Sequence, residues 1–451
     1  MLKQRYDLDG GLGAVRDMIT RCAQNLKPVG SFTPAKMFQR QNLGGLLLDR
    51  EEAIKFEQAL STLSPDEGQP RSISRATVNA LIEEAILVAL DIHQKQPGTN
   101  LEDRTRSAIQ VLREKLQAPI VDWEVWRTVD RLKVPAEGYS LGKILFCDAN
   151  HDAAQKAHAT LIEILKSHPT PLPSSSLSDY WPDEFSKQTL CRISVKAGDD
   201  TAARQLADGE LQTTISVLNF FASLVFPTDL LPVVCISKSL PSYSVVELAL
   251  TESPKLYFSA YDSEHRSSLP FDLKKFDRDA PVKEALNKVC ALLRDEGEIE
   301  FRDRLLTAVK WAGKGASTET RENSFLFYAI ALETLLLGGK HHEQLAYKLR
   351  LRAAHLLGRN PDGRARTRDR VNHLYEMRSK MAHSGKMQVP EADLSLLRII
   401  TQSCIIHLLS ADKFKDITTD KALEQWFENA VISGADESPP LGKIISAESG
   451  S

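Results

Sequence analysis

The chain has 451 residues, of which 42% are hydrophobic and 26% are charged. This composition supports roughly two or three domains with buried cores, and it excludes a disordered chain or a small peptide. The longest apolar run, Phe325 to Leu337, contains a glutamate and is shorter than the roughly 20 residues that cross a bilayer. The first residues lack the apolar core of a signal peptide. We therefore expect no membrane-spanning helix and a cytoplasmic protein.

The six cysteines are scattered along the chain and form no C-x-x-C pair. This pattern is typical of buried thiols in a reducing compartment and not of a zinc site or a disulfide framework. No phosphate-loop, dinucleotide-binding or nucleophile-elbow motif is present either. We therefore expect no metal and no cofactor.

Charge is distributed unevenly. Residues 301–390 contain 17 basic and 8 acidic residues, a net charge of +9, which leaves −12 for the rest of the chain. Five of the eleven histidines lie in the same segment. A basic field of this kind attracts RNA or other polyanions, although a solvated basic surface that faces an acidic neighbouring domain has the same composition.

In chain order, residues 1–136 form a predicted N-terminal helical region, because apolar residues recur every three or four positions in residues 51–60, 75–94 and 100–117. Residues 137–278 form a predicted α/β region. Its helices are expected at residues 152–168 and 200–225, and its short strands at residues 139–147, 189–197, 230–239, 242–251 and 255–263.

Residues 279–432, here called the helical domain, contain a run of predicted helices with short connections. These are expected at residues 281–296, 298–313, 321–339, 341–358, 366–385 and 390–410. Gly358 and Gly385 stand where helices should end, and Pro390 where the next should begin. Residues 433–451 are expected to be a flexible tail. The fold class is thus a mostly helical, multidomain α+β protein.

One short segment, LYEMRSKMAHSG at residues 374–385, combines a fixed cation with a titratable imidazole. Arg378 and His383 point about 140° apart on an ideal helix, so they converge only if the helix ends near His383 or if two copies meet. A neutral imidazole can take a proton from a 2'-hydroxyl, and a guanidinium can bind the phosphate. Alternatively, Arg378 pairs with Glu376 or Glu333, and His383 caps a helix C-terminus.

Three segments of the helical domain together resemble the Apea-like branch of the HEPN superfamily. They are FYAIALETLL at residues 327–336, KLRLRAAHLLG at residues 348–358 and LYEMRSKMAHSGK at residues 374–386. The resemblance covers under a third of the chain and includes the family's terminal R-x(4–6)-H motif. Part of the α/β region also looks like the strand and helix that often precede such domains.

The resemblance implies a helical bundle that dimerises and cleaves RNA without a metal, commonly in antiviral defence or abortive infection. It assigns phosphate binding to Arg378 and acid/base chemistry to His383. Ser379 stands where the family commonly has Asn. The expected partners are RNA, including tRNA, a second copy of the chain, and a phage or host trigger at the N-terminal region; no membrane partner is expected.

Further residues are expected to support this site. Glu333 lies on a helix that is apolar nearly all round, so we predict that it pairs with an arginine, either Arg378 or Arg352, unless it forms an ordinary ion pair between helices. Tyr375 either packs in the core, stacks on a base or packs against Arg378. The predicted RNA-binding residues, for which a solvated surface is the alternative, are Arg352, Arg364, Arg366, Arg368, Arg370, Lys380 and Lys386.

A rival interpretation assigns no catalysis to the helical domain. Some HEPN domains are catalytically silent modules that dimerise and bind nucleotide or nucleic acid for a partner protein. Convergence of the Arg378 and His383 pairs on one cleft would favour the ribonuclease, whereas engagement of Arg378 in buried ion pairs would favour the module.

Overall fold

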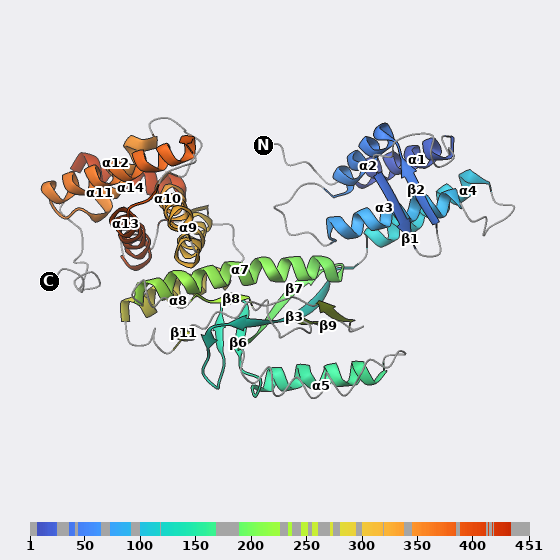
Figure 1. The fold of residues 1–451 in the computed structure, drawn as a ribbon, viewed down its shortest axis with the longest axis horizontal. Helices are drawn as coiled ribbons and strands as arrows, with labels where there is room; N and C mark the ends of the chain where they lie inside the picture. The colour runs from blue at the N-terminus through green and yellow to red at the C-terminus, as the bar shows by residue number, and fades with distance from the viewer. Residues whose placement is uncertain are drawn as a thin grey trace. The chain divides into compact units, whose positions relative to one another are not determined.

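The computed structural model describes residues 7–24, 36–40, 44–64, 73–91, 100–117, 119–167, 189–225, 233–236, 245–250, 255–259, 271–273, 280–294, 300–318, 320–337, 345–384, 388–411, 414, 417 and 419–433. The described residues form a mostly helical α+β fold with a small, largely antiparallel sheet (Figure 1). The predicted tail lies outside them.

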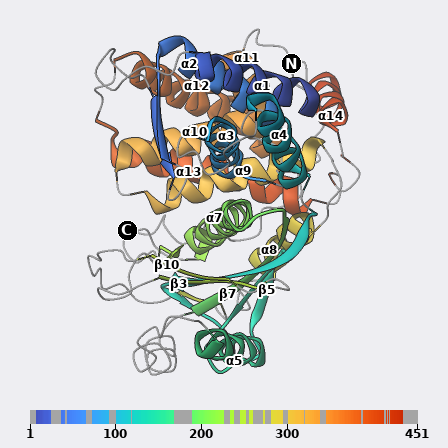
Figure 2. The same cartoon turned by 90° about the vertical axis from the view of Figure 1, so that its right-hand side faces the viewer.

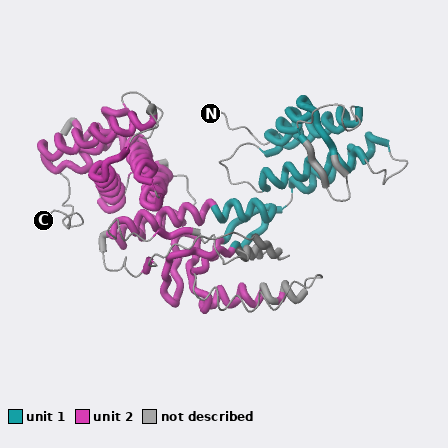
Figure 3. Tube along the Cα trace, in the orientation of Figure 1, with its two compact units in different colours: residues 1–125, 194–208, 248–255 teal, residues 126–193, 209–247, 256–451 magenta. Residues whose placement is uncertain are grey.

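The chain divides into two compact units, which Figure 3 shows in two colours. Unit 1 comprises Met1–Val125, Ser194–Asp208 and Leu248–Lys255. Unit 2 comprises Trp126–Ile193, Gly209–Glu247 and Leu256–Ser451, and it therefore contains the whole helical domain.

Unit 1 is built around four helices and a hairpin. They are α1 (Leu8–Gln24), α2 (Arg50–Leu63), α3 (Arg75–Leu90), α4 (Leu101–Leu116), β1 (Lys36–Arg40) and β2 (Gly44–Leu48). Apolar residues of all four helices and of β2 form one buried core. Side chains cap three of the helices, and Asp49 and Glu52 form a complete capping box at α2.

The hairpin corrects the expectation that the first 136 residues are helical. Strands β1 and β2 pair antiparallel, from Lys36 opposite Leu48 to Arg40 opposite Gly44. The sequence of β2, Gly-Gly-Leu-Leu-Leu, does not alternate apolar with polar residues, so it carries no period-two signal. A third strand missed at this end is β3 (Val121–Asp130), which also lies within the region expected to be helical.

The larger sheet has seven strands among the described residues, in the order β10-β9-β3-β7-β6-β5, with β8 also paired to β3. The strands are β5 (Tyr139–Leu141), β6 (Ile144–Cys147), β7 (Thr189–Ala197), β8 (Cys235–Ile236), β9 (Val245–Leu250), β10 (Lys255–Ser259) and β3. Each of the five predicted strand runs therefore contains a strand. Gly142 turns the chain between β5 and β6 with φ +62°, a conformation that glycine adopts without strain. Separately, β4 (Leu132–Lys133) pairs parallel with β11 (Phe271–Asp272).

Two long helices cover the sheet. Helix α5 (Asp152–Ser167) and helix α7 (Asp200–Val225) lie on opposite faces, as Figures 1 and 2 show. Both were predicted. Helix α7 also packs closely against the helical domain, because a Cβ on Gly313 would lie only 1.8 Å from the backbone oxygen of Ser216. Only glycine allows the two helix backbones to approach this closely.

The helical domain comprises seven described helices. They are α8 (Ala280–Arg294), α9 (Glu300–Ser317), α10 (Arg321–Leu337), α11 (Leu345–Leu357), α12 (Pro361–Ser384), α13 (Glu391–Ser410) and α14 (Asp420–Ser433). The central helix is α10, which packs against α9, α11, α12 and α13. Helix α11 ends immediately before Gly358, and Pro390 directly precedes α13, so both predicted helix boundaries are confirmed.

Helix α13 is the one helix in the described part of the chain that is long and apolar enough to cross a membrane. Most of its apolar window is buried inside the protein, and the core helix of a bundle has the same properties. The cytoplasmic location therefore stays a prediction.

Candidate functional site

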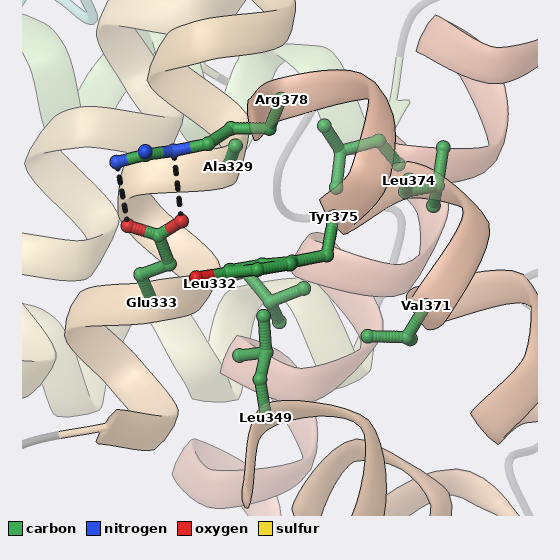
Figure 4. A pocket seen from close by; sticks show the side chains of 9 residues that line it. Ala329, Leu332, Glu333, Leu349, Val371, Leu374, Tyr375 and Arg378 are labelled. Atoms are coloured by element: carbon green, nitrogen blue, oxygen red, sulfur yellow. Dashed lines mark hydrogen bonds and ion pairs between the residues drawn. The ribbon is translucent and has the colours of Figure 1, made fainter. Parts of the chain in front are cut away.

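An ion pair between Glu333 on α10 and Arg378 on α12 forms the centre of the candidate site (Figure 4). Nη2 of Arg378 donates a hydrogen bond to Oε2 of Glu333 at 3.1 Å, and Nε lies 3.0 Å from Oε1. The Nε contact is an ion pair whose angle falls outside that of a hydrogen bond. The arginine thus presents one long edge of its guanidinium to the carboxylate, as the predicted pairing of Glu333 requires.

Both partners are only partly exposed. The side chain of Arg378 is 33% exposed and that of Glu333 is 21% exposed. Burial raises the pKa of the Glu333 carboxyl, and the charge and hydrogen bond of Arg378 act in the opposite direction. The guanidinium therefore offsets part of the cost of burying the Glu333 carboxylate.

A narrow cavity lies beside the ion pair. Its lining is mainly apolar and comprises Ala329, Leu332, Leu349, Val371, Leu374, Tyr375 and Leu397 together with the two charged residues. Its volume is about 10 Å³, which is close to the space that one water molecule needs, so a nucleobase cannot enter. Tyr375 is half-buried and lines this cavity beside Arg378, so core packing, stacking on a base and packing against Arg378 all stay predictions for this residue.

The ion pair leaves part of the guanidinium available. An arginine has five N–H groups. Glu333 faces the N–H of Nε and one N–H of Nη2, so three remain. Among the described residues, none accepts a hydrogen bond from Nη1 of Arg378. These donors are directed away from Glu333 and can bind a phosphate oxygen outside the cavity.

His383 lies in the last turn of α12, which continues to Ser384. The prediction that a helix ends near His383 is therefore confirmed, although His383 is still helical. Because α12 is helical from Arg378 through His383, the two positions leave its axis about 140° apart. The side chain of His383 lies outside the described residues. Ser379 is half-buried, and its hydroxyl has no hydrogen-bond partner in the described part of the chain.

The prediction that Arg352 binds RNA is not supported by its position. Arg352 is buried, donates from Nη1 to the backbone oxygen of Leu336 at 2.6 Å, and pairs through Nη2 with Glu424 on α14 at 3.0 Å. Arg304 on α9 makes the same two kinds of contact: it donates a hydrogen bond to the backbone oxygen of Thr334 and forms an ion pair with Asp420. The last four backbone carbonyl groups of a helix have no hydrogen-bond partner within the helix. At the end of α10, two of these carbonyl groups accept hydrogen bonds from Arg304 and Arg352. Arg352 therefore holds α10, α11 and α14 together and is not a free RNA ligand.

The other predicted RNA-binding residues lie mainly on the surface of α12. Arg366, Arg368 and Arg370 are exposed, and Arg364 is half-buried. Arg368 lies 2.8 Å from the neighbouring carboxylate of Asp369, whereas Arg366 and Arg370 form no ion pair with a described carboxylate. Lys380 is exposed, and Lys386 lies outside the described residues.

Sequence reasoning missed a polar contact between α11 and α12. Nη1 of Arg350 donates to Oδ1 of Asn372 at 2.7 Å, and Asn372 donates to Glu376 at 2.7 Å. The guanidinium of Arg350 also lies 5.4 Å from the ring centre of Tyr347, whose exposed fraction is 50%. The only available sequence signal was the i, i+4 spacing of Asn372 and Glu376.

No protein-family model, curated protein or solved structure matches the chain. Within the described residues, no three His, Cys, Asp or Glu side chains converge as metal ligands would. The assignment to the HEPN superfamily and the expected absence of a metal therefore stay predictions.

Proposed function

We propose that the helical domain is a metal-independent endoribonuclease of the HEPN type, in which Arg378 and His383 act together across a homodimer. One observation carries the proposal: a carboxylate from the core helix α10 holds the edge of the Arg378 guanidinium and leaves three N–H groups free. A guanidinium fixed in this way is already oriented toward the charge that develops on a phosphate. The cleft between two copies would supply the RNA site, since the cavity beside Arg378 is too small.

The proposed chemistry needs only these groups and the substrate. Neutral His383 takes the proton of a 2'-hydroxyl, and the resulting oxyanion attacks the adjacent phosphorus. The bond from phosphorus to the 5'-oxygen breaks, and that oxygen receives a proton from an imidazolium. Arg378 binds the non-bridging phosphate oxygens throughout. The products are a 2',3'-cyclic phosphate and a 5'-hydroxyl, and DNA is not cleaved because it lacks the nucleophile.

The geometry of α12 supports a second copy in the proposed site. Arg378 and His383 leave one continuous helix about 140° apart, so the two positions do not share a face of that helix. A two-fold axis near the end of α12 lets the arginine of one protomer act with the histidine of the other.

A second candidate is the silent binding module, and the Glu333–Arg378 ion pair favours it because an engaged arginine is less available to substrate. The module would bind RNA or nucleotide with an affinity that does not depend on His383, and it would generate no new RNA ends.

The test is cleavage of total RNA and tRNA by the purified chain with chelator present. We expect 2',3'-cyclic phosphate ends from the wild type and none from His383→Ala or Arg378→Ala. His373→Ala is the matched control, because His373 is an exposed histidine of the same helix that pairs with Asp393 at 3.1 Å. If the wild type binds RNA but leaves its ends unchanged, the module is correct.

The proposed role in antiviral defence has its support in the family resemblance alone. We propose that the N-terminal region restrains the nuclease until a phage or host trigger acts on it. Expression of the wild type with its trigger should arrest the host, and His383→Ala should not. Removal of residues 1–278 without a change in cleavage or toxicity would contradict the restraint.

A further inference from the structure

A pair of aromatic rings lies at the surface of the helical domain, away from the ion pair. Trp311 on α9 and Phe327 on α10 are stacked, with ring centres 5.5 Å apart and planes inclined by 28°. Both side chains are half-buried, so part of each remains accessible. Trp311 lies two residues before Gly313, which faces α7, and thus about 160° away from that contact around α9.

Two lysines of α9 are near Trp311 in the sequence, and one of them lies over its ring. Nζ of Lys314 lies 4.5 Å from the ring centre of Trp311, and Lys310 lies one turn earlier on the same helix. Neither lysine forms an ion pair with a carboxylate of the described residues. The pKa of Lys314 is lowered, first by burial and then by the charge of Lys310. The charge of Lys310 thus acts on the half-buried Lys314, and neither ammonium group has a carboxylate partner among the described residues.

Packing alone does not account for this arrangement. A lysine over a partly exposed aromatic ring stabilises a protein only weakly. Two like charges beside each other at i and i+4 reduce helix stability. A ligand that supplies negative charge to both lysines and a flat ring to Trp311 relieves the repulsion and replaces the contact of Lys314 with the indole.

We propose that Trp311, Phe327, Lys310 and Lys314 form a subsite for single-stranded RNA, in which one base stacks on the aromatic pair and the lysines bind the adjoining phosphates. Single strands fit because their bases are free to stack, whereas a duplex hides its base faces. The inference rests on the proposed function and extends it by naming a surface that holds the substrate. Phe327 and Glu333 are six residues apart on α10, about 9 Å along its axis and about 120° apart around it.

Binding is measured with a fluorescein-labelled oligouridine of about twelve nucleotides, 2'-O-methylated so that it cannot be cleaved through its 2'-oxygens. Fluorescence anisotropy of the full-length chain gives Kd between 50 and 200 mM salt. The variants are Lys310→Gln/Lys314→Gln, Lys310→Arg/Lys314→Arg and Trp311→Leu. The matched control, Lys133→Gln/Lys156→Gln, removes two exposed lysines outside the helical domain.

Loss of two phosphate contacts should reduce the slope of log Kd against log salt by about 1.4. Trp311→Leu should raise Kd about fivefold or more, because a stacked base is lost. The arginine pair and the control should keep wild-type affinity and slope. If Trp311→Leu fails to fold, the lysine variants, which leave the aromatic pair unchanged, decide the question.

The inference is overturned if the glutamine pair binds with wild-type affinity and slope, if the control loses as much, or if the wild type binds no oligouridine. The same proteins are then tested on unmodified tRNA. If the glutamine pair cleaves tRNA as well as the wild type does, the proposed ribonuclease stands and the proposed subsite is wrong. If binding depends on the lysines but the wild type cleaves no tRNA, the subsite stands and the ribonuclease is wrong.

Discussion

Replacement of Arg378 by methionine tests the energetic role of the ion pair. The substitution keeps much of the aliphatic volume of the side chain and removes the charge that faces Glu333. At neutral pH it leaves a carboxylate that is 21% exposed without its cation. We therefore expect a loss of stability that comes from the stranded charge and not from lost packing.

The exposed fractions of the Arg378 and Glu333 side chains determine the size of the expected stability loss. Exposed ion pairs contribute about 0–1 kcal/mol, whereas breaking a fully buried pair costs about 3–5 kcal/mol. With side chains 33% and 21% exposed, this pair lies between the two cases, and we expect a loss of about 2 kcal/mol. For a domain of roughly 150 residues this lowers Tm by about 4–8 °C.

The pH dependence has a definite sign. Burial raises the pKa of Glu333 above its ordinary value of 4.5, and Arg378 counteracts this shift. Without Arg378 the folded-state pKa rises further, so the folded chain binds a proton more tightly than the unfolded chain. Stability then falls as pH rises from 4.5 through the folded-state pKa. The loss in Arg378→Met is therefore larger at pH 7.5 than near pH 4.5.

Thermal unfolding of the full-length chain at both pH values measures the loss. Hydrogen exchange of α10 and α12 localises it to the helical domain. The matched control is Glu333→Gln/Arg378→Met, which should recover most of the lost stability at pH 7.5 because no charge is stranded. An equal decrease in Tm at both pH values, with no recovery in the double variant, would refute the electrostatic explanation.

Three further predictions follow from buried groups. Asp420→Ala strands a buried guanidinium on α9 and should cost about 3–5 kcal/mol, with α14 losing hydrogen-exchange protection first. Gly313→Ala places a Cβ against the backbone oxygen of Ser216 and should cost about 1–3 kcal/mol by overpacking; an unchanged Tm would contradict the close contact of α7 and α9. Burial raises the pKa of buried thiols, to about 12 for Cys22. Ellman's reagent at pH 8 should therefore react quickly only with half-buried Cys235, and with the other thiols only after denaturation.

Local signals in the sequence were sufficient for most of the helices and strands. The end of α11 before Gly358 and the start of α13 after Pro390 follow from the conformational preferences of single residues. An arginine partner for Glu333 was also predictable, because a carboxylate on an apolar helix needs a cation, but the sequence left Arg378 and Arg352 as alternatives. The hairpin β1–β2 was not, since its stability depends on packing against α2 and α3 and not on alternation within its strands.

Long-range partners explain the remaining misses. Arg352 looked like one more surface cation in a basic segment, but its acid, Glu424, lies 72 residues later on a helix that was not predicted. Nothing near Arg352 in the sequence distinguishes a buried, paired arginine from an exposed one. Trp311 likewise became a candidate only when folding brought Phe327 against it.

Long-range ion pairs also reduce the effective positive charge of the helical domain. The net charge of +9 in residues 301–390 counts three arginines whose acids lie beyond Pro390. Those pairs are Arg304–Asp420, Arg321–Glu391 and Arg352–Glu424. The basic field is therefore weaker than the segment's composition indicates.

The remaining positive charge is concentrated at lysines and arginines that have no carboxylate partner among the described residues. Lys314 lies over the ring of Trp311 on α9, with Lys310 one turn earlier, and Arg366 and Arg370 lie one turn apart on the exposed start of α12. Phosphate contacts fix the register of a nucleic acid but do not cleave it. On the proposed function, these cations would hold the strand, and Arg378, already oriented by Glu333, would be left to act on the one phosphate that reacts.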